Sequence, residues 1–112
     1  MSFSVHFTIR SRTDLRNIHA YISKNDSVEN ADYVAREIVR TALALREFPK
    51  RGAHPPELLA IGNKTYRQLF FKPYRILYRV RGTVVYIAVI ADGRRNMKSL
   101  LMRRLADRRK AN

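Results

Sequence analysis

Residues 74–91 read YRILYRVRGTVVYIAVIA, two strand-like stretches joined at Gly82 and Thr83. The first stretch alternates between two sets of side chains, with Tyr74, Ile76, Tyr78 and Val80 on one face and Arg75, Leu77, Arg79 and Arg81 on the other. This period of two predicts a strand whose two faces meet different surroundings. Residues 84–91 are almost wholly apolar, which predicts a central strand covered on both faces. Gly82 can adopt the positive φ of a tight turn, so we expect the two strands to form a hairpin.

The N-terminal third predicts a strand followed by a helix. A first strand, at an edge of the same sheet, is indicated by the alternation of Phe3, Val5, Phe7 and Ile9 with polar residues. The helix should begin near Ser11 or Thr13, either of which could cap it, with Asp14 in its first turn. It should end near Asn25, since asparagine and the following aspartate favour turns.

The remaining elements follow from the same kind of periodicity. Apolar residues from Ala31 to Leu45 recur at steps of three and four, which predicts a second helix that Ser27 or Asn30 caps and Pro49 ends. Residues 49–65 are rich in proline and glycine and predict a loop, with one helical turn at 56–59. A strand at 66–72 should stop at Pro73, and residues 97–109 predict an amphipathic basic helix.

Together these elements predict one α+β domain over residues 1–112. An N-terminal strand and an α-helical hairpin precede an antiparallel sheet, and a basic helix follows it. Both helices of the hairpin should cover one face of the sheet.

Composition limits the kinds of partner and site. The chain has 112 residues, 46% of them hydrophobic, and carries a formal net charge of +14, which favours an anionic partner. It has no cysteine, and the N-terminus lacks a signal-peptide pattern. The longest apolar run, residues 84–91, is too short to cross a bilayer. We therefore expect a soluble cytoplasmic protein that does not act at a membrane.

The arginines of residues 74–81 are the main candidate site. We expect Arg75 and Arg79 to point away from the helical hairpin onto an open face, with Arg67 as their neighbour. Six Lys or Arg residues and no Asp or Glu lie between Leu58 and Ala91, so these charges have no partner nearby in the sequence. Replacement of Arg75 should then leave folding nearly intact. The basic set continues with Arg94, Arg95, Arg103 and Arg104. The alternative is a merely solvated basic face, because arginine stems cover sheet surface well.

No other motif indicates a catalytic, metal or cofactor site. His6, His19 and His54 lack the spacing of metal ligands, and we expect each on the surface or in a loop. No glycine-rich phosphate loop precedes a helix. The tyrosines at 66, 74, 78 and 86 occupy strand positions, where core or cross-strand packing is their ordinary role. We therefore expect no cofactor and no metal.

The order of several segments resembles a known superfamily. LRNIHAYI, LREFPKRG, YRQLFFKPYRILYRV and VYIAVIADGRR, in this order, resemble the RelE/ParE toxins of bacterial toxin–antitoxin modules over nearly the whole chain. The resemblance implies one of two activities. ParE-like members are implied to poison DNA gyrase, whereas RelE-like members cleave mRNA in the ribosome with basic sheet residues and a C-terminal tyrosine or histidine as base.

The sequence is closer to the ParE-like members. Arg67 and Arg75 match the basic sheet positions, and Arg94 or Arg95 matches the basic residue after the last strand. Near Leu101 and Met102, where the base would lie, no ionisable side chain is present, and no tyrosine or histidine follows Tyr86. The resemblance therefore implies a gyrase inhibitor rather than a catalyst, neutralised by an acidic ParD-like antitoxin. A ribosome-dependent mRNA endonuclease is the alternative, and a non-toxic nucleic-acid-binding module is a third possibility.

Overall fold

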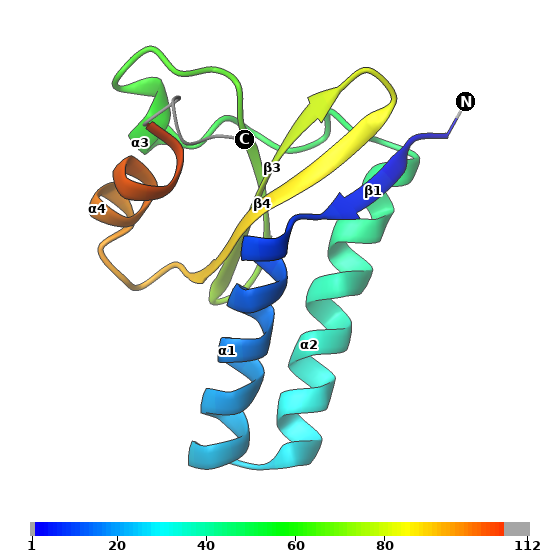
Figure 1. The fold of residues 1–112 in the computed structure, drawn as a ribbon, viewed down its shortest axis with the longest axis vertical. Coiled ribbons are helices and arrows are strands. Elements are labelled where there is room, and N and C mark those ends of the chain that lie inside the picture. The colour runs from blue at the N-terminus through cyan, green and yellow to red at the C-terminus, as the bar shows by residue number, and fades with distance from the viewer. Residues whose placement is uncertain (1, 107–112) are drawn as a thin grey trace.

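The fold is a four-stranded sheet with a long helical hairpin on one face and short helices on the other. The computed structural model describes residues 2–106, drawn as a ribbon in Figure 1. Its elements, in chain order, are β1 (Ser4–Phe7), α1 (Ile9–Asn25), α2 (Val28–Leu43), the 3₁₀ turn η1 (Ala44–Arg46), α3 (Pro56–Leu59), β2 (Arg67–Phe71), β3 (Tyr74–Arg81), β4 (Val84–Asp92), α4 (Met97–Leu101) and the π-helical turn η2 (Met102–Ala106).

The strands lie in the order β1-β4-β3-β2, so β4 is interior and β1 forms an edge, as predicted. Strands β2, β3 and β4 pair antiparallel, whereas β1 runs parallel to β4. The sheet is therefore mixed rather than purely antiparallel. Gly82 has a φ of 61° in the turn between β3 and β4, which confirms its predicted role.

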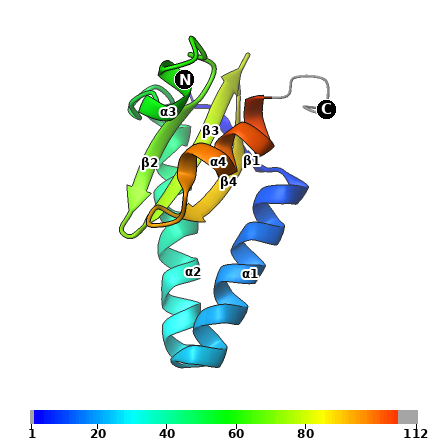
Figure 2. The same cartoon turned by 90° about the vertical axis from the view of Figure 1, so that its left-hand side faces the viewer.

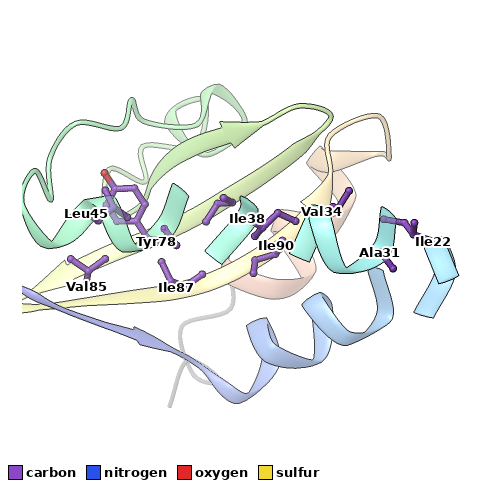
Figure 3. Close-up of a cluster of buried hydrophobic side chains, with 11 residues drawn as sticks. Ile22, Ala31, Val34, Ile38, Leu45, Tyr78, Val85, Ile87 and Ile90 are labelled. Carbon is purple, nitrogen blue, oxygen red and sulfur yellow. The ribbon is translucent and has the colours of Figure 1, made fainter. Parts of the chain in front are cut away.

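The helical hairpin covers the face that carries the apolar set of β3. Ile76 and Tyr78 pack there with Ile38 of α2 and Leu45 of η1, and Figure 3 shows the cluster. The hydroxyl oxygen of the fully buried Tyr78 accepts a hydrogen bond from the Gly52 N–H at 3.0 Å, which satisfies its one polar atom. Both helices run well past the end of the sheet (Figure 1).

The boundary between β1 and α1 differs from the prediction. The strand ends at Phe7, and α1 begins at Ile9, because Thr8 is the N-cap and its hydroxyl oxygen accepts the Ser11 N–H at 3.2 Å. Ser11 is buried within the first turn and is not the cap. The apolar phase of β1 continues by chance to Ile9, so periodicity alone places the boundary too late.

Part of the second face of the sheet is covered by α3, α4 and η2 (Figure 2). Met97, Leu100, Leu101 and Leu105 form the predicted apolar stripe and pack on Leu77 and Val89. Regular α-helix ends at Leu101, however, so one basic helix reaching Arg109 is not confirmed, and residues 107–109 lie outside the described residues. None of the helices between residues 2 and 106 is long and apolar enough to span a bilayer.

Candidate functional site

Arg75 is a buried structural residue, which corrects the prediction of an exposed one. It is 8% exposed, and its guanidinium donates two hydrogen bonds of 2.8 Å to the Glu57 carboxylate and one of 2.8 Å to Gln68 Oε1. The bonds from Arg75 hold the pKa of Glu57 below its ordinary value. Glu57 lies in α3, directly before the stretch from Leu58 to Ala91 that contains no Asp or Glu, and α3 places its carboxylate over the sheet. These contacts argue against the expectation that replacement of Arg75 leaves folding nearly intact.

Arg67 lies on the opposite face from Arg75. It pairs across the strands with Tyr78, so it faces the side of the helical hairpin. Its Nη1 donates to the Gly52 carbonyl oxygen at 2.8 Å and thereby holds the loop before α3 against β2. The prediction that Arg67 and Arg75 are neighbours on one basic face is wrong, because the register of the β2–β3 pair places them on different sides.

The basic residues after β4 divide into those with an ion pair in the described structure and those without one. Arg94 binds Asp92 with bonds of 3.0 and 2.7 Å, which lower the pKa of that carboxyl. Arg95 and Arg103 are exposed, and neither forms an ion pair with a residue between 2 and 106. These two charges remain available for a partner.

Arg104 is an anchor for the C-terminal segment. Its side chain is 10% exposed, donates two bonds of 3.0 Å to Asp14, and donates another to the Ala88 carbonyl oxygen at 3.0 Å. Asp14 also accepts the Ile90 N–H at 3.0 Å, beyond the point where β1 ends its pairing with β4. Because α1 begins at Ile9, Asp14 lies in the second turn and faces the sheet. Its role is tertiary rather than that of a helix-start residue.

Arg79, like Arg67 and Arg81 of the same sheet, forms no ion pair with an acidic residue in the described part of the chain. It lies in a row of side chains that crosses the sheet: His6 pairs with Tyr86, and Tyr86 pairs with Arg79. The Arg79 guanidinium is 5.9 Å from the centroid of the Tyr66 ring, and the His6 and Tyr86 rings meet edge to face at 5.7 Å. Arg79 Nε is buried, and no group of residues 2–106 accepts its hydrogen.

This row forms part of a concave pocket of about 490 Å³. Its cationic lining residues are Arg10, Arg79, Arg81 and Arg104. Its rings are those of His6, Tyr66 and Tyr86. No Asp or Glu is among the described residues that line it. The pocket therefore presents an excess of positive charge beside aromatic rings.

Sequence reasoning missed the contribution of His6 to this pocket. The resemblance places an ionisable ring after Tyr86, whereas the parallel pairing of β1 with β4 places His6 beside Tyr86 from the other end of the chain. One feature of the sequence does indicate this position. His6 alternates with the apolar residues of the first strand, which places it on the sheet face away from the helical hairpin. Tyr66 and Tyr86, assigned to packing, are pocket residues as well.

Residues 5–97 match the family profile described as the ParE toxin of the type II toxin–antitoxin system, parDE. The chain belongs to the ParE toxin family. It is accordingly the toxin component of a type II toxin–antitoxin system. A search of curated proteins finds no match.

Solved structures of the RelE/ParE superfamily share the fold of this ParE-family chain. The chromosomal ParDE system of Pseudomonas aeruginosa gives a TM-score of 0.69 at 22% identity, over 81% of this chain and 96% of that one. The RelBE2 complex of Mycobacterium tuberculosis gives 0.61 at 22% identity, over 82% and 99%. A mutant of Escherichia coli RelE in the free state gives 0.60 at 13% identity, over 89% and 93%. At these identities the likeness establishes the fold.

Proposed function

We propose that this ParE-family toxin inhibits DNA gyrase and is neutralised by an acidic ParD-like antitoxin. The observation that carries the proposal is the family match over residues 5–97. The surface is compatible with it, because Arg95 and Arg103 are exposed and carry no ion pair within the described residues. Exposed cations without an ion pair in the described structure are suited to an acidic surface of a target protein or of its bound DNA.

Gyrase inhibition is tested with the purified toxin on gyrase and on translating ribosomes. We expect inhibition of supercoiling or accumulation of gyrase–DNA cleavage complexes, and no appreciable cutting of mRNA. Expression without antitoxin should induce the DNA-damage response and filamentation. Codon-specific mRNA cleavage with gyrase fully active would overturn the proposal in favour of the ribosomal alternative.

The residues that contact the target are tested by single charge reversals. Arg103→Glu and Arg95→Glu should each weaken gyrase inhibition, whereas Arg46→Glu, an exposed residue elsewhere, should not. Arg104 is unsuitable for this test because its ion pair with Asp14 supports the fold. Equal inhibition by all three variants would exclude Arg95 and Arg103 as contact residues.

Neutralisation by an acidic antitoxin is tested by thermal unfolding of the complex. The net charge of +14 destabilises the free toxin by self-repulsion, so an acidic partner should raise its melting temperature. A ligand that binds only the native state adds about 2.7 kcal/mol at 100 times its Kd. The partner to test is the product of the adjacent reading frame, which we expect to be acidic. An unchanged melting temperature at saturating partner would contradict this assignment.

A further inference from the structure

The pocket on the sheet face has a lining that the gyrase proposal does not use. Tyr66, Arg79, Tyr86 and His6 occupy neighbouring positions from one side of the sheet to the other. The row consists of three flat rings and one guanidinium, which lies between Tyr66 and Tyr86. Both kinds of group can bind a ligand, since a ring offers a face for stacking and an arginine offers several N–H donors.

Arg79 is held ready for an anion. Tyr66 is only 6% exposed and supports the guanidinium from one side. The buried Nε has no acceptor between residues 2 and 106, and a buried donor without an acceptor is costly. Arg81 from the same strand and Arg10 from α1 line the same pocket, and no carboxylate is among its described lining residues. An oxyanion placed here would gain charge-assisted hydrogen bonds from more than one arginine.

The other end of the row suits a flat apolar group. His6 is exposed and Tyr86 is half-buried, so these rings can be approached from solvent, unlike the ring of Tyr66. Ala88 and Leu105 add apolar surface to the same pocket. A volume of about 490 Å³ lies within the range typical of small-ligand sites, roughly 300–1,000 Å³. It is more than a single carboxylate or phosphate group would fill.

We propose that this pocket binds a nucleotide, with its phosphate on Arg79, Arg81 and Arg10 and its base against Tyr86 and His6. Arginines beside accessible rings are the combination that binds single-stranded nucleic acid. A base in a duplex is stacked on both faces and cannot enter a concave pocket, so the ligand is a free nucleotide or one within a single strand. An acidic peptide would satisfy the arginines and leave the rings unused.

Direct binding assays distinguish these ligands without gyrase, so their outcome is independent of the gyrase proposal. Fluorescence anisotropy would be measured at fixed ionic strength with labelled oligothymidylate, oligouridylate and a matched duplex. Uridine monophosphate, thymidine monophosphate, inorganic phosphate and oligoglutamate would serve as competitors. We expect the single strands to bind more tightly than the duplex. Competition by the mononucleotides alone would identify free nucleotides as sufficient, and a preference between the two strands would identify DNA or RNA as the source.

Matched variants test the residues. Arg79→Gln should weaken single-strand binding roughly 10-fold or more, as expected for loss of a charge-assisted bond, whereas Arg46→Gln removes the same charge outside the pocket and should change it less than about twofold. Tyr86→Leu keeps apolar volume but removes the ring, and should weaken binding roughly 5- to 150-fold. Arg81→Gln, at an exposed position, repeats the test if Arg79→Gln fails to fold.

Three results would overturn the proposal. The first is duplex binding as tight as single-strand binding, and the second is an equal loss for Arg46→Gln and the pocket variants, since both indicate attraction by net charge alone. The third is competition by oligoglutamate that is as strong as competition by the mononucleotides and unaffected by Tyr86→Leu, which would assign the pocket to an acidic peptide.

Discussion

Strand β3 carries two arginines four residues apart on the same side of the sheet, Arg75 and Arg79, in opposite surroundings. At one end, α3 delivers Glu57 and β2 delivers Gln68, so the charge of Arg75 is buried and fully paired. At the other end, Arg79 rests on Tyr66 beside an open pocket and has no carboxylate partner within residues 2–106. The same residue type in the same phase of one strand thus stabilises the fold at one end and is available to a ligand at the other.

The largest expected effect separates the two arginines by stability. Arg75→Ala leaves Glu57 and Gln68 without their partner and should lower the free energy of unfolding by about 3 kcal/mol, the low end for a broken buried pair because Glu57 keeps some exposure to water. Arg79→Ala should cost less than about 1 kcal/mol, because it removes no ion pair or hydrogen bond among residues 2–106. Urea denaturation of both variants measures the difference in unfolding free energy. Equal midpoints would show that Arg75 and Arg79 contribute equally to stability.

A second, smaller effect applies the same distinction to the C-terminal segment. Arg104→Ala removes the bonds to Asp14 and Ala88 and should cost about 1–3 kcal/mol. Arg103→Ala, at the adjacent exposed position, should remain within about 0.5 kcal/mol of the parent. Thermal and urea unfolding measure the stability of both variants. If the Arg104 variant were as stable as the Arg103 variant, Arg104 would not anchor the C-terminal segment.

The smallest expected effect is a pH dependence confined to the Arg75 end. The pKa of Glu57 is lowered from its ordinary value of 4.5, so its contribution to stability is fully present above that pH and is lost as the pH falls through the folded-state pKa. The stability difference between the parent and Glu57→Gln should therefore shrink as the pH is lowered below about 4.5. Urea midpoints at neutral and acidic pH test this, and a difference that stays constant would exclude the Glu57–Arg75 pair as its source.

Local patterns predicted the elements whose signals are local. The alternation in residues 74–81, the apolar run after Gly82 and the repeat in the second helix each identify an element, because every one of them packs on a continuous apolar surface. The start of α1 was predicted too late, because Thr8, as the cap, interrupts a strand phase that the sequence continues to Ile9. The alternation continues for two residues beyond the end of β1, but the capping bond of Thr8 starts the helix there instead.

The candidate site was predicted less well, because charge pairing and pocket formation are tertiary. Nothing local to β3 distinguishes Arg75 from Arg79: the partner of the first comes from α3, and the support of the second comes from the residue before β2. Asp14 and Arg104 are 90 positions apart in sequence and still form one of the least exposed ion pairs in the described structure. His6 enters the pocket only through the pairing of the first strand with the last.

That pairing also sets when the pocket can exist during synthesis. Residues 4–7 are among the first to be synthesised, and their partners 84–87 belong to the last strand of the sheet. A nascent chain that stops before β4 therefore lacks Tyr86, and it also lacks the strand that lies between His6 and Arg79. At about 5–20 residues per second, the N-terminal strand waits roughly 4–16 s for its partner. An interrupted translation product therefore cannot assemble this surface, and the binding site appears only once the chain is nearly complete.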